Sequence, residues 1–183
     1  MTPSSPDLHA GGHQEMSALP VLGVRAQISV RVAVAQDVTN LERLRDLAAA
    51  HISSQRGGVV ALLREFADNS AFEELTEGQI SQGRLILIGL ISETAVGYCF
   101  AESVKLSDDF ALCQIQELFV ESEARDVGVG QLLMDSLTAW AVQQRCGGID
   151  ATVMPGDRET KNFFETFGLV ARAISVHLDL PRK

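Results

Sequence analysis

One stretch of this chain constrains its fold more than any other. Between residues 115 and 145, an apolar strand pattern, a short glycine-bearing loop and a long amphipathic helix pattern follow one another. Apolar residues recur every three or four positions over residues 130–145, which gives the expected helix one apolar face. That face must be buried against another layer, and the preceding strand predicts that this layer is a sheet.

The rest of the chain shows the same mixture of strand and helix patterns. Asp37 precedes a run with helical spacing and is expected to be its N-cap. The expected elements, in chain order, are a strand at 28–34, helices at 38–51, 59–67 and 72–82, strands at 84–91, 94–105 and 111–120, the long helix at 130–145, a strand at 149–154, a helix at 158–167 and a final strand at 169–180. This order predicts a mixed α/β or α+β fold.

The domain organisation is simple. A chain of 183 residues has the size of one ordinary domain. Residues 1–27 are rich in Pro, Ser, Gly and Ala and show no sustained period, so we expect a flexible tail there. The domain itself is expected to span residues 28–183.

Composition excludes several classes of function. The net charge is −9, and residues 65–126 hold thirteen acidic against three basic side chains. An acidic surface repels phosphates, so we expect no nucleic-acid partner, whereas a cationic partner would suit it. No window approaches the roughly 18 apolar residues of a membrane span, so no membrane partner is expected either.

The remaining signals point to a cytoplasmic protein without a metal. The first residues lack the basic and apolar regions of a secretory signal. The three cysteines are widely spaced and form no CxxC pair, which argues against a disulfide scaffold and a zinc site. His9 and His13 stand four apart in the expected tail, without the Glu that would complete a zincin motif.

The loop between the strand and the long helix carries the chemistry. A helix N-terminus offers unpaired N–H groups, glycine lets that backbone approach an anion, and Arg125 adds a planar cation suited to phosphate. Together they predict a pyrophosphate cradle. A Walker A loop is excluded because Gln131 follows Gly130, and a Rossmann loop because Leu133 stands where a third glycine is needed. Alternatively, Gly128 and Gly130 only begin the helix.

The sequence Arg-x-x-Gly-x-Gly after a Glu-Leu-Phe-Val strand resembles motif A of the GCN5-related N-acetyltransferase (GNAT) superfamily. Residues 160–169, TKNFFETFGL, look like the late helix of that family, and the order of elements is similar from residue 28 to the end. The resemblance implies the GNAT fold, a central mixed and mostly antiparallel sheet flanked by helices. It also implies acetyl-CoA as co-substrate, without a metal.

The resemblance implies that the cofactor lies between two central strands that splay apart. A strand backbone would pair with its pantetheine arm, loop N–H groups would hold its pyrophosphate, and the late helix would line its thiol end. The implied cofactor-binding residues are Leu118, Phe119 and Val120 on the strand, Arg125, Asp126, Val127, Gly128, Val129 and Gly130 in the loop, and Asn162 and Phe164, with Phe163 beside them, on the late helix.

The implied reaction is direct transfer of an acetyl group to a primary amine. A protonated amine is not nucleophilic, so a base or a water path must remove a proton. Glu117 is the candidate base, since a glutamate at this place serves as base in some similar enzymes. Strand alternation puts it on the opposite face from Leu118. The alternative is a solvated strand glutamate. An oxyanion would be stabilised by a backbone N–H near Val120.

Two residues depart from the pattern of the family. Phe164 stands where a tyrosine often protonates the leaving thiolate, so the thiolate leaves as an anion or takes its proton from water or another side chain. Tyr98 is the chain's sole tyrosine and is expected to be a core or cleft-lining ring. Asp157 stands where many members carry Asn, and would weaken cofactor binding or contact a cationic substrate. His51 is expected to be structural, at the end of its helix.

These departures keep a second function open, a non-catalytic module of the same fold that binds or senses an acyl-CoA. A third possibility is transfer of a longer acyl chain. For the enzyme, the acidic stretch favours a cationic small molecule or an exposed peptide amino group as acceptor. A homodimer is possible, because dimers are common among similar proteins.

Overall fold

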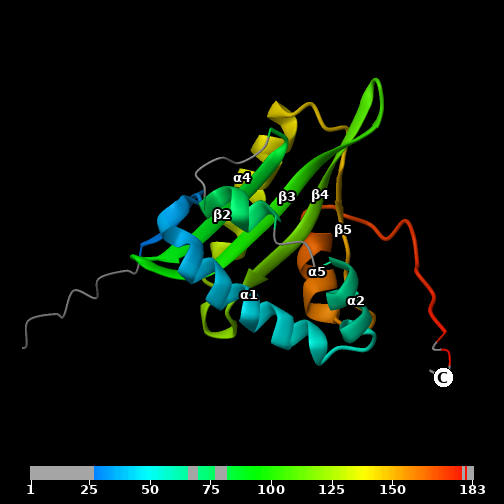
Figure 1. Ribbon diagram of the computed structural model, residues 1–183, viewed down its shortest axis with the longest axis horizontal. Coiled ribbons are helices and arrows are strands. Elements are labelled where there is room, and N and C mark those ends of the chain that lie inside the picture. The colour runs from blue at the N-terminus through cyan, green and yellow to red at the C-terminus, as the bar shows by residue number, and fades with distance from the viewer. Residues whose placement is uncertain (1–26, 66–69, 77–81, 179, 181–183) are drawn as a thin grey trace, which may run out of the picture.

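The computed structural model describes residues 27–65, 70–76, 82–178 and 180 (Figure 1). Five strands form one sheet in the order β1-β2-β3-β4-β5, which are β1 (Ile28–Val32), β2 (Arg84–Ile91), β3 (Thr94–Ser107), β4 (Phe110–Val120) and β5 (Ile149–Ala151). The first four are antiparallel neighbours, and β5 runs parallel to β4. The expected mixed, mostly antiparallel sheet is confirmed. All but the last residue of the expected N-terminal tail lies outside the described residues.

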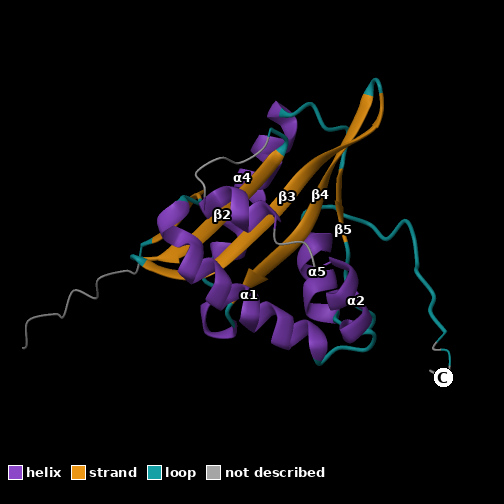
Figure 2. Cartoon of the chain, in the orientation of Figure 1, coloured by secondary structure: helices purple, strands orange, loops and turns teal. Residues whose placement is uncertain are grey.

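Helices cover both faces of this sheet (Figure 2). They are α1 (Val38–Ser53), α2 (Gly58–Glu65), α3 (Ser70–Thr76), α4 (Val129–Gln143) and α5 (Arg158–Thr166). Strand β2 shows why the sheet needs both layers: Leu85 and Leu87 belong to the core beneath α4, whereas Ile86 and Ile88 belong to the core beneath α1. A continuous apolar run of this kind is stable only when both faces are covered.

The start of α1 differs from the expectation. Asp37 occupies the N-cap position, but its side chain makes no capping hydrogen bond to α1. Its carboxylate instead accepts a hydrogen bond from the Val34 N–H at 2.8 Å and two from the Arg31 guanidinium, at 2.6 and 2.8 Å. An arginine nearby offers a stronger, charge-assisted contact than the helix N–H groups do.

The described bounds of two other elements differ from the expectation. The helix expected at 72–82 is α3 (Ser70–Thr76), and residues 77–81 lie outside the described part. The strand expected at 149–154 pairs over three residues only, because β5 parts from β4 after Ala151.

The expected final strand at 169–180 is wrong. The Leu169 N–H bonds the Phe164 carbonyl at 3.2 Å and so closes α5. Residues 170–178 and 180 then form no helix or strand, and Ile174 and Val176 are 88% and 90% exposed. Alternation makes a strand only where a neighbouring strand supplies hydrogen bonds and apolar cover, and residues 170–178 pair with none of the described strands.

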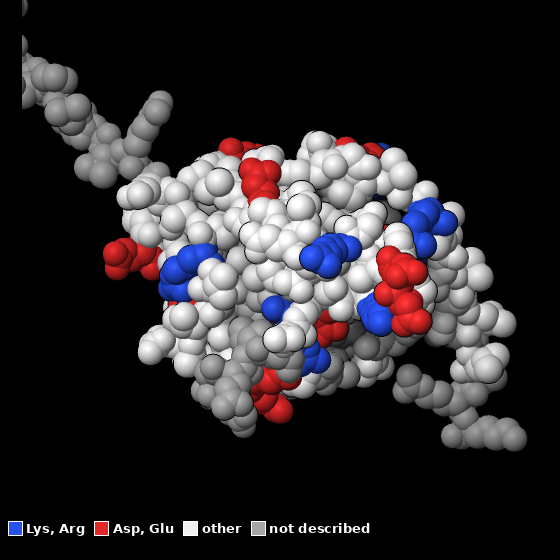
Figure 3. All heavy atoms as spheres, turned by 90° about the horizontal axis from the view of Figure 1, so that it is seen from above, with Lys and Arg blue, Asp and Glu red and all other residues white. Residues whose placement is uncertain are grey.

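The surface charge is mixed on the face that Figure 3 shows, where acidic and basic side chains lie interspersed among uncharged ones. Several acids are paired with bases, such as Glu121 with Arg43 and Asp150 with Arg172. The acidic net charge is therefore not gathered into one patch on this face. None of the helices in the described part of the chain is long and apolar enough to cross a membrane.

Candidate active site

A cleft of ≈ 520 Å³ opens where β4 and β5 part. The two strands pair only from Cys113 to Ile115 on β4. Beyond that point, residues 116–120 of β4 and residues 152–154 after β5 both line the cleft. The pairing of β4 with β3 shifts register at the same place, because Phe100 opposes Glu117 while Ala101 opposes Ile115. Such a bulge bends a strand and turns its end away from its neighbour.

The cleft brings together the candidate base and nine of the eleven residues that the resemblance implies for cofactor binding. They are Glu117, Leu118, Phe119, Val120, Arg125, Asp126, Gly128, Gly130, Asn162 and Phe164. The other two are not part of its lining: Val127 is 49% exposed, and Val129 is buried in the core.

The two glycines at the start of α4 are required for different structural reasons. Gly128 has φ +101°, a left-handed conformation that side chains disfavour. A Cβ on Gly130 would lie 3.0 Å from the Phe163 ring, so this glycine lets α5 approach α4 closely. Packing and turn geometry therefore account for both glycines. Both also line the cleft, where the missing side chains leave the backbone open to a ligand.

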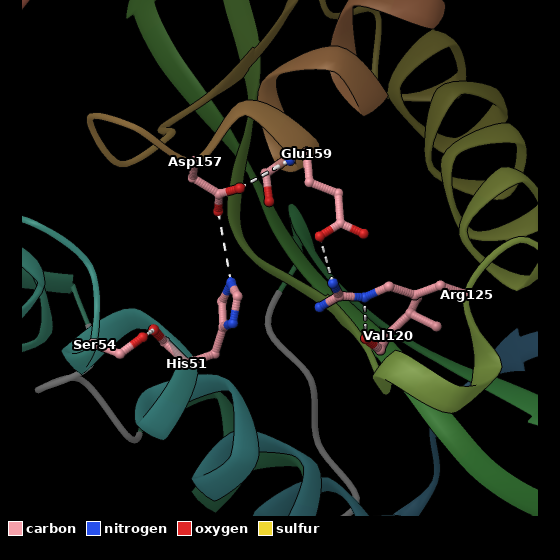
Figure 4. Close-up of polar contacts among 7 residues, drawn as sticks. His51, Ser54, Val120, Arg125, Asp157 and Glu159 are labelled. Atoms are coloured by element: carbon pink, nitrogen blue, oxygen red, sulfur yellow. Dashed lines mark hydrogen bonds and ion pairs between the residues drawn. The ribbon is translucent and has the colours of Figure 1, made fainter.

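Arg125 places a cation between the end of β4 and the start of α5 (Figure 4). Its Nε donates to the Val120 carbonyl at 3.2 Å, and its Nη1 donates to the Glu159 carboxylate at 2.7 Å. The Arg125 side chain is only 28% exposed. It is held by a backbone carbonyl and engaged by an anionic group, which is the kind of partner that a phosphate would offer.

Glu117 is buried, at 5% exposure, so the alternative of a solvated glutamate is wrong. Arg45 of α1 donates to both of its oxygens: Nε lies 3.0 Å from Oε1 and 3.1 Å from Oε2, and Nη2 lies 2.8 Å from Oε1. The Tyr98 hydroxyl donates to Oε2 at 2.7 Å. Glu117 thus faces α1, whereas Leu118 packs into the core beneath α4, which confirms the expected alternation along β4.

Tyr98 is fully buried in the protein and contributes to the wall of the cleft, as expected. Burial raises the pKa of its hydroxyl well above the ordinary value, and the charge of Glu117 raises it further. The hydroxyl therefore stays protonated at neutral pH and acts as a donor. Arg45 also stacks over the Phe72 ring at 4.8 Å, which fixes the guanidinium from its other side.

His51 and Asp157 face each other across the cleft, with Nε2 and Oδ2 3.7 Å apart (Figure 4). The other Asp157 oxygen caps α5 by accepting from the Thr160 N–H at 3.0 Å. This pair joins the end of α1 to the start of α5. Sequence reasoning placed His51 at a helix end but missed its position in the cleft, because its partner lies far away in the chain.

The late helix supplies an aromatic wall. Phe164 is 5% exposed, and Phe163 lies edge-on to Phe164 and to Phe167, with ring centroids 5.5 and 5.1 Å apart. Asn162 lines the cleft from the exposed side of the same helix. Rings packed in this way form a stiff apolar surface for a ligand.

Comparison with solved structures shows the fold. The BH1408 protein from Bacillus halodurans, in its tetramutant form, is 21% identical with a TM-score of 0.68, over 83% of this chain and 99% of that one. AAC(6')-Iy, in complex with the bisubstrate analog CoA-S-monomethyl-acetylneamine, is 14% identical with a TM-score of 0.62, over 86% and 100%. A ribosomal-protein-alanine N-acetyltransferase from Brucella melitensis biovar Abortus 2308 is 13% identical with a TM-score of 0.61, over 84% and 99%.

No curated protein matches the chain. The model of the Acetyltransferase (GNAT) family, however, matches residues 58–169, which is more than half of the sequence. That match runs from α2 to the end of α5 and contains the parts of the cleft that β4, β5, α4 and α5 supply, whereas the lining residues of α1 lie before it. The resemblance noted in motif A and the late helix is thereby confirmed, and the chain belongs to the acetyltransferase (GNAT) family of acyltransferases.

Proposed function

We propose that the protein transfers the acetyl group of acetyl-CoA directly to a primary amine. The observation that carries the proposal is the cleft between β4 and β5, which has the loop and N-terminus of α4 at its edge. Two neighbouring structures support it, since AAC(6')-Iy was solved in complex with CoA and with a CoA-linked bisubstrate analog.

The residues of the cleft fit acetyl-CoA, which when bound supplies an acetyl group activated as a thioester. The open backbone at Gly128 and Gly130 and the Arg125 guanidinium suit its pyrophosphate. In this proposal the backbone of residues 118–120 pairs with the pantetheine arm, and Asn162 and Phe164 line the thiol end.

We further propose that Glu117 accepts the proton that the acceptor ammonium must lose, directly or through a water molecule. Its place in the lining of the cleft supports this role. The Arg45 ion pair fixes the carboxylate, so the proton acceptor is already oriented before a substrate arrives.

The acceptor in this proposal is a cationic amine, either a small molecule or an exposed amino group of a peptide. Four acidic side chains line the cleft, namely Glu117, Asp126, Asp157 and Glu159. Glu121 and Glu123 line a neighbouring hollow that shares His51 and Arg125 with the cleft. Anionic walls of this kind attract a positively charged substrate. The neighbours described by name as aminoglycoside and ribosomal-protein-alanine acetyltransferases agree with an amine acceptor.

The first test is calorimetric titration with acetyl-CoA. We expect a micromolar Kd, about −8 kcal/mol. Gly128→Glu should abolish binding, because it puts a side chain and a negative charge at a left-handed position that lines the cleft. Gly168→Glu is the matched control, since Gly168 also has positive φ, has no atom within 4 Å of its missing Cβ and lies outside the cleft lining. Unchanged affinity in a folded Gly128→Glu variant would contradict the proposed cradle.

The second test measures release of free thiol from acetyl-CoA with a panel of amines. We expect cationic polyamines and lysine peptides to be acetylated faster than a primary amine of similar size that carries no positive charge besides its own ammonium group. Equal rates with that amine would contradict the proposed cationic acceptor, and no release with any amine would contradict the proposed transfer.

A further inference from the structure

Glu159 is an anionic side chain on the cation that the proposed function assigns to a phosphate. Its carboxylate accepts a hydrogen bond from Arg125 Nη1 at 2.7 Å, and both residues line the cleft. The contact joins the loop before α4 to the first turn of α5 (Figure 4). Among the described residues, Arg125 is the sole hydrogen-bond partner of this carboxylate. The Glu159 side chain is 68% exposed, so it can turn into water when another anion takes its place.

The two acidic side chains that line the cleft at the start of α5 differ in how firmly they are held. Asp157 is the N-cap, with one oxygen accepting from the Thr160 N–H at 3.0 Å and the other facing His51. Its side chain is 12% exposed. Glu159 caps nothing and is bound through the Arg125 contact alone. Loss of that contact therefore leaves the start of α5 in place and moves one exposed side chain.

The hydrogen bonds of Arg125 define what it can still offer to a phosphate. Its Nε is committed to the Val120 carbonyl at 3.2 Å, which fixes the guanidinium at the end of β4. A guanidinium binds a phosphate best through two parallel N–H bonds. With Nε committed, the remaining pair of nitrogens is Nη1 and Nη2, and Glu159 is bound at Nη1. Two anions on one nitrogen repel each other, so a bidentate phosphate contact favours the departure of Glu159.

We propose that Glu159 competes with the pyrophosphate of the cofactor for Arg125, so that it binds this cation in the empty cleft and binds it again as CoA leaves. The inference rests on the proposed function, because it takes acetyl-CoA as the ligand of the cleft. Product CoA keeps its pyrophosphate after the acetyl group has been transferred, so the contact that holds the substrate also holds the product. An internal competitor weakens that contact and speeds product release, a step that limits the turnover of many enzymes.

The test is calorimetric titration of the full chain with CoA and with pantetheine, which carries the thiol arm without any phosphate. We expect Glu159→Gln to lower the Kd for CoA about threefold and to slow CoA dissociation by a similar factor. Pantetheine should bind the variant and the wild type alike. Glu165→Gln is the matched control, because Glu165 lies on the same helix, pairs with Lys161 and is outside the cleft lining. It removes the same charge and should leave the Kd for CoA unchanged.

The Arg125→Gln background separates competition for Arg125 from simple repulsion of phosphate. Without the guanidinium, Glu159 has nothing to compete for, so adding Glu159→Gln to Arg125→Gln should not change the Kd for CoA further. A tightening that persists in this background would overturn the proposal, since Glu159 would then act on the phosphates without Arg125.

The outcomes distinguish this inference from the proposed function. An unchanged or higher Kd for CoA in Glu159→Gln would overturn the inference and leave the proposed acetyl transfer intact, and so would an equal tightening for pantetheine. If Glu159→Gln tightens CoA in a protein that acetylates no amine, the competition is supported and only the transfer is contradicted. Absence of CoA binding in the wild type and in Glu159→Gln alike would overturn the proposed cofactor site together with the competition.

Discussion

The described part of the molecule buries two charged residues, both carboxylates, and they differ in the elements that their ion pairs connect. Asp37 and Glu117 are each 5% exposed, and each is held by two hydrogen-bonding nitrogens of one arginine. The partner of Asp37 is Arg31, only six residues away and 46% exposed. The partner of Glu117 is Arg45, seventy-two residues away and 13% exposed.

The difference lies in what each pair connects. The Asp37 pair closes a turn between β1 and α1, and its arginine remains in contact with water. The Glu117 pair joins α1 to β4 in the wall of the cleft and includes the Tyr98 hydroxyl. Desolvating both ions of a pair is costly. A costly long-range pair in a cleft, unlike a local solvated one, is therefore a candidate for function.

The largest expected effect is on stability when Glu117 is truncated. Glu117→Ala leaves the Arg45 guanidinium desolvated without its carboxylate, and we expect a loss of about 3 kcal/mol in the free energy of unfolding. Asp37→Ala should cost less, about 1–2 kcal/mol, because Arg31 can turn to water. Urea denaturation with equal m-values measures both. Equal losses of unfolding free energy in the two variants would contradict the claim that the desolvated Glu117 pair matters more to stability than the solvated Asp37 pair.

The next effect separates function from stability. Glu117→Gln keeps the shape of the side chain but removes its basicity, and we expect the rate of acetyl transfer to fall about 100-fold with unchanged acetyl-CoA affinity. The rise of rate with pH should flatten as well. Asp37→Asn is the matched control, a buried amide in place of a buried carboxylate outside the cleft lining, and should leave the rate alone. An unaltered pH–rate profile in Glu117→Gln would contradict the proposal that Glu117 is the base.

A smaller effect concerns pH and Asp37. Hydrogen bonds from Arg31 lower the pKa of this carboxyl below its ordinary value of 3.8. The folded state thus holds its proton less tightly than the unfolded state. The stability from the pair is complete above the ordinary value and disappears as the pH falls through the lower, folded one. Asp37→Asn should unfold more easily than the wild type by about 1 kcal/mol at neutral pH, and the gap should narrow in acid. A difference in unfolding free energy between wild type and Asp37→Asn that stays constant with pH would contradict a lowered pKa of Asp37 in the folded state.

The local elements of this fold could be read from the sequence, since their patterns depend on neighbours in the chain. Apolar spacing predicts α1 and α4, alternation predicts β1, and apolar runs between turn signals predict β2, β3 and β4. The glycine loop was found because its chemistry also lies within a few residues. The Arg45–Glu117 and His51–Asp157 contacts were missed, because no local signal distinguishes Arg45 or His51 from an ordinary polar residue on a helix. The final strand was predicted from a local pattern alone, whereas strand formation also requires a neighbour.

The smallest expected effect tests whether Tyr98 only positions Glu117. Tyr98→Phe removes one hydrogen bond to a buried carboxylate and should cost about 1 kcal/mol at neutral pH. We expect the rate to fall less than about tenfold, since Arg45 still holds Glu117 in place. A fall in rate as large as that of Glu117→Gln would instead indicate that the Tyr98 hydroxyl protonates the leaving thiolate, a role that Phe164 cannot fill because its ring carries no hydroxyl.

High pH gives this variant a second readout. Burial and the Glu117 charge raise the pKa of Tyr98 above 10.0, so the unfolded state loses the phenol proton first. Wild-type stability should therefore fall as the pH rises beyond that value, and its advantage over Tyr98→Phe should disappear there. Tyr98 is the chain's sole tyrosine, so the ultraviolet absorbance of tyrosinate follows its ionisation directly. Tyrosinate that appears in the folded protein near the ordinary pKa would show that the hydroxyl is open to water, and its bond to Glu117 would then be too weak to orient the carboxylate.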